Sequence, residues 1–151
     1  MTAYLPRPNM LLLSALVALL FSCPSPATER TGEGDEPLRV RLGQEFDLRV
    51  GRQAAVEGEG FRVKFASVVS DSRCPEGVAC VWAGNAEVLI EAEAGGSRAG
   101  LKLNTHGGDG FPKEGRHQQY SVGLVALKPR PHKDVAVKAA DYVATLVIRK
   151  E

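Results

Sequence analysis

Two cysteines near the middle of the chain are its strongest candidates for chemistry. They lie in residues 71–84, DSRCPEGVACVWAG, with five residues between Cys74 and Cys80. A thiol redox centre usually has two residues between its cysteines, so that one thiol lowers the pKa of the other. A structural zinc site needs four ligands, commonly arranged as two close pairs. The spacing therefore favours a structural disulfide, with redox or metal use as the alternatives.

Two further residues of this stretch are candidates for contact with a partner. Trp82 is the only tryptophan in the chain. We expect it to pack in the core against a disulfide, as tryptophan does in other β-sandwiches; the alternative is an exposed aromatic anchor for a ligand. We expect Arg73 to be exposed, either as an ordinary solvated arginine or as a residue that sets partner specificity. Pro75 and Gly77 favour a tight turn between the cysteines.

Three histidines and one aspartate form the candidate metal cluster of the sequence. His106 and Asp109 lie in THGGDG, a composition typical of an exposed loop, and His117 follows in the polar stretch KEGRH. Such side chains, with His132, could converge on copper or zinc. Scattered surface histidines are far commoner, so we expect no cofactor and keep these residues as weak metal candidates.

No motif in the sequence indicates an enzyme. The serines lack a Gly-x-Ser-x-Gly context, and neither an HExxH nor a P-loop string occurs. Glu91 and Glu93 are two apart on a predicted strand and would point to one face, a pattern that could serve glycoside hydrolysis. A solvated outer face is the preferred interpretation of that pair.

The N-terminal region has the pattern of an export signal. Residues 10–21, MLLLSALVALLF, form an unbroken run of low polarity, shorter than the roughly 20 residues that a membrane-spanning helix needs. The run ends in LFSC at residues 20–23, which resembles the lipobox of bacterial lipoproteins. That resemblance implies removal of residues 1–22 and several acyl chains on Cys23, which together make a firm membrane anchor. If the Cys23 sulfur is acylated, Cys74 and Cys80 remain as one pair in an oxidising compartment.

The rest of the chain divides into a tether and one domain. Residues 23–37 contain PSPATERTGEGDEP, which has no large apolar residue and is predicted to be a flexible tether. From residue 38 to 151, apolar residues alternate with polar ones, as in half-buried strands. The alternating segments are 38–42, 46–50, 61–65, 86–91 and 101–103, and two further apolar runs follow at 120–127 and 142–148. Glycine-rich turns separate them, so we predict an all-β domain, a single antiparallel sandwich or barrel of seven or eight strands.

Charge and composition exclude some partners. The chain is 44% hydrophobic and 25% charged, with a formal net charge of +1. Charges of both signs are interspersed, and no basic stripe with interleaved aromatic residues occurs. Nucleic acid is therefore not an expected partner.

The cysteine stretch resembles a motif of small exported bacterial proteins, many of them lipoproteins. In these proteins DSRCP, a second cysteine and WAG recur in that order, and an alternating strand follows. The segments YSVGL from Tyr120, LKPRP from Leu127 and DY from Asp141 also suit the pattern, so the resemblance covers most of the chain from Leu38 onward. It implies a fold and a location, and it carries no activity.

Together these patterns predict a lipid-anchored protein of the bacterial cell envelope, attached through Cys23 on the periplasmic or outer side. We expect a non-enzymatic binding or interaction module whose partner is an envelope protein or a small ligand. One alternative is a periplasmic metal-binding protein that uses the histidine and aspartate loop. The other is an inhibitor-like module that presents a disulfide-stapled loop.

Overall fold

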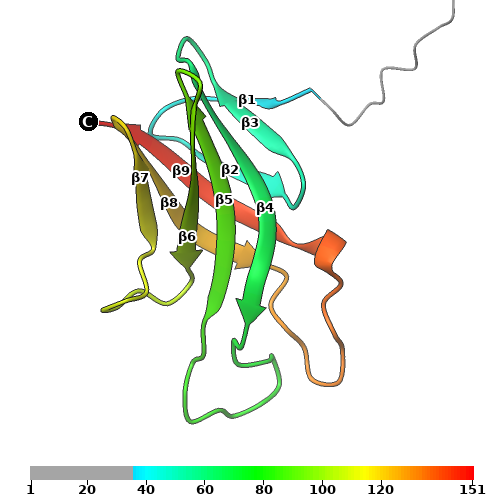
Figure 1. Ribbon diagram of the computed structural model, residues 1–151. Coiled ribbons are helices and arrows are strands. Elements are labelled where there is room, and N and C mark those ends of the chain that lie inside the picture. The colour runs from blue at the N-terminus through cyan, green and yellow to red at the C-terminus, as the bar shows by residue number, and fades with distance from the viewer. Residues whose placement is uncertain (1–35) are drawn as a thin grey trace, which may run out of the picture. The chain divides into compact units, whose positions relative to one another are not determined.

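The computed structural model describes residues 36–151. The predicted signal peptide and Cys23 lie outside the described residues, as does the predicted tether up to residue 35. The described chain folds into two β-sheets with one short 3-10 turn, Ala139–Asp141, and no α-helix (Figure 1). Within residues 36–151 no helix has the length and apolar character to cross a membrane.

Nine strands form the two sheets. The five-stranded sheet contains, in spatial order, β1 (Leu38–Val40), β3 (Gln53–Val56), β4 (Phe61–Asp71), β5 (Ala86–Ala94) and β6 (Ser97–Asn104). The four-stranded sheet contains β2 (Glu45–Arg49), β9 (Val143–Lys150), β8 (Tyr120–Lys128) and β7 (Glu114–His117). All neighbours pair antiparallel except β1 and β3, which are parallel. The predicted all-β sandwich with one disulfide is confirmed, with one or two strands more than expected.

The alternating pattern places one face of each sheet in a shared core. In β5, Val88 and Ile90 point inward and are fully buried, whereas Glu91 points to solvent. The largest fully buried side chains come from both sheets: Leu48, Phe61, Phe65, Ile90, Leu103, Leu146 and Ile148. Because burial of one such side chain contributes about 1.5–3 kcal/mol, this core gives the loops a stable support.

Three loops leave the sandwich at the same end. They are the stapled loop (residues 72–85, between β4 and β5), the glycine loop (residues 105–113, between β6 and β7) and the β8–β9 loop (residues 129–142). Figure 1 shows all three toward the bottom of the domain, whereas β1 lies near the other end. We refer to these three loops together as the loop end.

Candidate functional site

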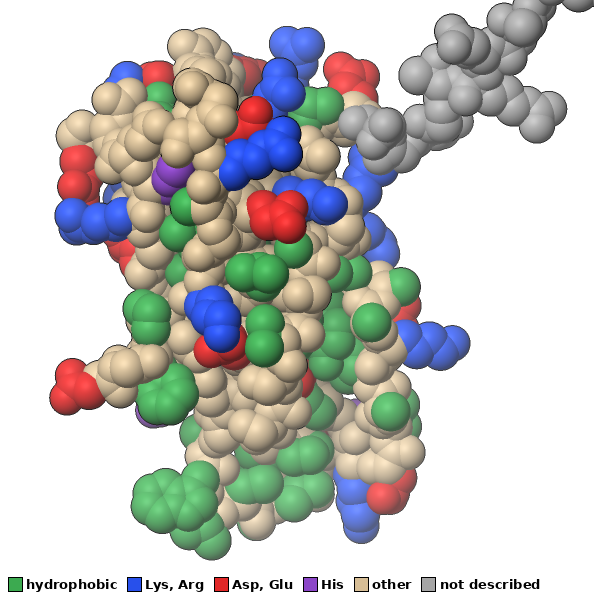
Figure 2. All heavy atoms as spheres, viewed as in Figure 1, with side chains coloured by type: hydrophobic (Ala, Val, Ile, Leu, Met, Phe, Trp, Pro, Cys, Tyr) green, Lys and Arg blue, Asp and Glu red, His purple; other side chains and the backbone are tan. Residues whose placement is uncertain are grey.

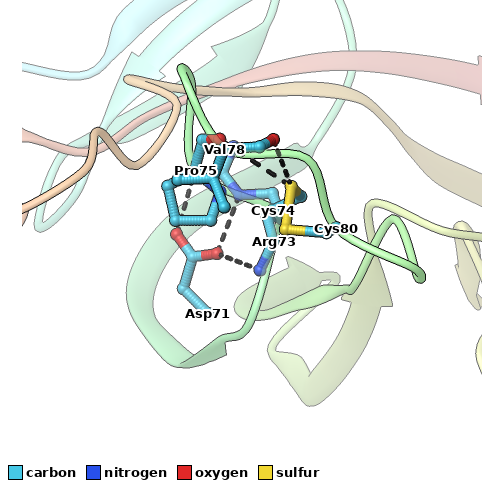
Figure 3. Close-up of a disulfide and its surroundings, with 6 residues drawn as sticks. All are labelled: Asp71, Arg73, Cys74, Pro75, Val78 and Cys80. Atoms are coloured by element: carbon cyan, nitrogen blue, oxygen red, sulfur yellow. Dashed lines mark hydrogen bonds and ion pairs between the residues drawn. A yellow bond between two sulfur atoms is a disulfide. The ribbon is translucent and has the colours of Figure 1, made fainter.

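A disulfide joins Cys74 to Cys80 inside the stapled loop. Their Cα atoms are 6.0 Å apart, within the usual range for a disulfide. Figure 3 shows this disulfide. The Cys74 amide also donates a hydrogen bond to the Ala83 carbonyl (2.9 Å), so the two arms of the loop are joined by backbone as well as by sulfur. The predicted pairing is confirmed, and it leaves neither sulfur as a free thiolate that could bind a metal.

Arg73 belongs to the stapled loop, but its side chain is buried and only 8% exposed. Its Nε and Nη2 donate to the two carboxylate oxygens of Asp71 at 2.8 and 2.6 Å. Nη1 donates to the carbonyl of Leu127 (2.5 Å), and Nη2 also donates to that of Pro129 (2.8 Å). The expectation of an exposed Arg73 is therefore wrong. The planar guanidinium donates to one carboxylate and to two carbonyls at the end of β8. These hydrogen bonds compensate the desolvation of the buried charge.

The Asp71 carboxyl is held in its ionised form by this arrangement. Burial alone raises its pKa, but the hydrogen bonds and charge of Arg73 and a hydrogen bond from the Tyr142 hydroxyl outweigh burial, so the pKa lies below its ordinary value. The pKa of Tyr142 is raised, first by burial and then by the hydrogen bond that it donates to Asp71. These three side chains form a buried ionic support for the stapled loop.

Gly84 allows the two arms of the stapled loop to approach closely. Its φ of +70° lies in the left-handed region that favours glycine. A Cβ at this position would collide with the Ser72 carbonyl and lie 2.9 Å from the Arg73 Cα. Next to it, the Ser72 amide donates to the Asn85 carbonyl (2.7 Å). The final glycine of WAG is therefore required by this crossing of backbones.

Both flanking loops are attached to the stapled loop. Asn85 donates from its side chain to Asn104 (2.7 Å), and its Oδ1 accepts the backbone N–H of His106 (3.0 Å) at the start of the glycine loop. On the other side, the Glu76 amide donates to the Pro131 carbonyl (2.8 Å) of the β8–β9 loop. Within residues 36–151 no buried side-chain nitrogen or oxygen lacks a hydrogen-bond partner. The stapled loop is therefore hydrogen-bonded to both of its neighbouring loops.

The outer part of the stapled loop is apolar and exposed. Trp82 is 83% exposed and Val81 is 90% exposed. The expectation that Trp82 packs in the core is wrong for two reasons. Strand β5 begins only at Ala86, so Trp82 lies outside the sheet, and the side chains that are buried at this end of the domain include Arg73 and Tyr142, both bonded to Asp71. Figure 2 shows hydrophobic side chains gathered at this end of the domain.

A basic crevice opens beside the base of the stapled loop. It has a volume of about 340 Å³ and is lined by Ala83 and Gly84, by residues 105–106 and by the end of β8. Its charged or titratable lining residues are Arg73, His106, Lys128 and Arg130, and the lining contains no carboxylate. No sequence pattern indicates this group, because its members come from three segments that lie far apart in the chain.

The predicted metal residues are not brought together. His106 and Asp109 are exposed on the glycine loop, whereas His117 lies in β7, where its Nε2 is 3.0 Å from the Ser97 carbonyl oxygen. His132 is exposed on the β8–β9 loop. Among the described residues, no three histidine, cysteine or acidic side chains are grouped as metal ligands.

The carboxylates of β5 lie on the outer face of the five-stranded sheet, as expected. Glu91 Oε2 is 3.9 Å from Lys64 Nζ, and Glu93 Oε2 is 3.3 Å from Arg98 Nε. All four side chains are at least 39% exposed, so water screens these pairs. The geometry is that of a solvated sheet surface.

Comparison with known proteins adds no relative: no family model matches the chain, and no curated protein or solved structure matches it. The geometry of the loop end is thus the basis for a functional proposal.

Proposed function

We propose that this protein is a non-enzymatic interaction module, held at the bacterial cell envelope by acyl chains on Cys23, that binds its partner through the loop end. The exposure of Val81 and Trp82 carries the proposal. A soluble domain gains stability by burying such side chains, and here they project from a loop that is fixed at its base.

The support beneath these side chains favours binding over catalysis. Asp71 and Arg73 bond to each other and to nearby backbone, so the buried ionic groups of the loop end hold its shape. A loop fixed in advance loses little conformational freedom when it binds. Tryptophan is among the residues that most often dominate binding energy at interfaces. The loop end therefore has a rigid support and an aromatic anchor.

Affinity capture tests this function. The chain from residue 24, without its lipid, is immobilised as wild type, as Trp82→Ala and as the control Val125→Ala, and envelope extracts are passed over each. Val125 is also an exposed apolar residue (43%) but lies on β8. We expect a defined component that wild type and Val125→Ala retain and that Trp82→Ala loses at least tenfold, since interface hot spots exceed about 2 kcal/mol. Identical retention by all three baits would contradict the proposal.

The anchor has a separate test. Cys23→Ser should move the full-length protein from the membrane fraction to the soluble fraction, because the acylated sulfur is lost. Unchanged sedimentation with membranes would contradict lipid attachment through Cys23. It would say nothing against the proposed binding surface at the loop end.

A second candidate function is an inhibitor-like module. Its support is the disulfide between Cys74 and Cys80, which closes a short loop that exposes Val78 and is followed directly by the exposed Val81. Titration of this domain into a panel of serine and cysteine proteases tests it. Stoichiometric inhibition that disappears in Val81→Asp would favour this function over a general interaction module.

A further inference from the structure

The loop end combines two kinds of chemistry in a fixed order. Five of the eight exposed large hydrophobic side chains in residues 36–151 stand on its three loops: Val78, Val81, Trp82, Phe111 and Val135. In the stapled loop, Val81 and Trp82 are followed at once by Ala83 and Gly84, which line the basic crevice. The apolar tip is therefore outermost, and cationic groups lie behind it at the loop base.

The crevice is suited to an anion. Arg73 is more than nine-tenths buried, and its Nη1, which carries two hydrogens, bonds within the described chain only to the Leu127 carbonyl. Arg130 has no ion pair or side-chain hydrogen bond among residues 36–151. Lys128 pairs with Asp47 (3.1 Å), but both side chains are more than half exposed and the pair is weak. The Lys128 ammonium can therefore leave Asp47 and bind another anion.

From this order we infer that the loop end docks on a phospholipid surface, with Val81 and Trp82 in the interfacial layer and a lipid phosphate in the basic crevice. The inference rests on the proposed function and names the partner of the same surface. In a bilayer the apolar region lies deeper than the phosphates, so a docking protein needs apolar groups at its tip and cations behind them. Tryptophan is enriched at this interface, because its ring is apolar and its N–H is polar.

The charges of the loop end favour contact with a lipid phosphate only at the basic crevice. Four acidic residues also stand on its loops: Glu76, Asp109, Asp134 and Asp141. None of them lines the crevice. We therefore expect the phosphate to be bound there and expect only a modest preference for anionic lipid. A protein partner would need no such layered order of apolar and basic groups.

Trp82 reports directly on this contact, because it is the only tryptophan and is 83% exposed. The unacylated chain from residue 24 is suitable, since both sheets, the core and the disulfide lie within residues 38–150. It is titrated with vesicles of phosphatidylcholine and with vesicles in which one quarter of this lipid is replaced by phosphatidylglycerol. Tryptophan emission and co-sedimentation are measured, and inorganic phosphate is added in a separate arm.

We expect the emission to shift to the blue with both vesicles, with about fivefold tighter binding when phosphatidylglycerol is present, the effect of one basic side chain near an anionic surface. Val81→Asp should reduce vesicle binding at least tenfold, whereas the matched control Val125→Asp should leave it unchanged. Arg130→Gln should abolish the preference for phosphatidylglycerol and preserve binding to phosphatidylcholine. Far-UV circular dichroism confirms that each variant is folded.

Several results would overturn the inference. One is the absence of any emission shift and of any co-sedimentation with either vesicle. Another is equal vesicle binding by wild type and Val81→Asp, which would show that the apolar tip is not used. Binding of inorganic phosphate without binding of vesicles would assign the crevice to a free anion. In each case the Trp82-dependent capture of a component of envelope extracts remains a separate result, so failure of lipid docking is distinguishable from failure of the proposed function.

Discussion

The ion pair between Asp71 and Arg73 allows a quantitative test of how the stapled loop is held. Both side chains are only 8% exposed, and their closest N–O distance is 2.6 Å. We consider three variants: Asp71→Asn, Arg73→Met and the double variant. Each single variant removes one charge and leaves the other buried, whereas the double variant removes both.

The expected magnitude follows from burial. Breaking a buried pair by removing one partner typically costs about 3–5 kcal/mol, because the remaining charge is desolvated and uncompensated. Asp71→Asn leaves the Arg73 guanidinium with carbonyl acceptors only. Arg73→Met leaves the Asp71 carboxylate with the Tyr142 hydroxyl and one backbone N–H. The double variant should be less destabilised than the sum of the two by at least about 2 kcal/mol.

The assay is urea unfolding at pH 7 under oxidising conditions, followed by far-UV circular dichroism. Tryptophan fluorescence is a poor probe here, because Trp82 is already 83% exposed in the folded state. Costs below about 1 kcal/mol for both single variants, or strict additivity in the double variant, would refute the proposed role of the pair.

The pH dependence supplies an independent check of the same pair. The folded-state pKa of Asp71 lies below its ordinary value of 3.8. A depressed carboxyl pKa contributes stability that is fully present above the unfolded pKa and is lost as the pH falls through the folded value. Wild type should therefore lose stability below about pH 4 more steeply than Asp71→Asn. If the unfolding free energies of wild type and Asp71→Asn fall equally steeply below this pH, the assignment is contradicted.

Three further changes give simpler expectations. Gly84→Ala should cost about 2–4 kcal/mol, since its Cβ would collide with loop backbone, whereas Gly77→Ala, also at positive φ but in open space, should cost only about 1 kcal/mol; thermal unfolding separates the two. Replacing Cys74 and Cys80 by serine should cost about 2 kcal/mol, the loop-entropy value for so short a loop, measured against wild type in urea. Trp82→Ala should change the unfolding free energy by less than about 0.5 kcal/mol, and a larger loss would show that the side chain supports the fold.

The fold was largely predictable because strand patterns are local. The alternation in β5 follows directly from burial of one face, and glycine-rich segments separate the strands. β3 and β7 were not predicted, since QAAV carries only one large apolar residue and EGRH carries none. The pair Leu124 and Val125 broke the alternation in sequence, and the structure shows a bulge after Leu124 that turns Val125 to solvent.

The loop end was only partly predictable, because its geometry depends on contacts between distant segments. The disulfide follows from the number and spacing of the cysteines, which the sequence contains. The burial of Arg73 depends on carbonyls more than fifty residues away in β8 and after it. Likewise, the crevice unites residues of the stapled loop with His106 and Arg130. The arginine was expected outside as a solvated or specificity residue, and the tryptophan inside by analogy with other β-sandwiches; the structure shows the reverse.

That reversal is itself informative about function. Burying a charged arginine requires a carboxylate and two carbonyls to compensate its desolvation, and such pairs often give no more stability than apolar residues of similar size. Exposing a tryptophan forgoes the burial of an aromatic side chain of about 150–250 Å². A loop shaped by stability alone would have the opposite arrangement. The apolar tip on an ionic support therefore favours the proposal that the loop presents Val81 and Trp82 to a partner in a fixed geometry.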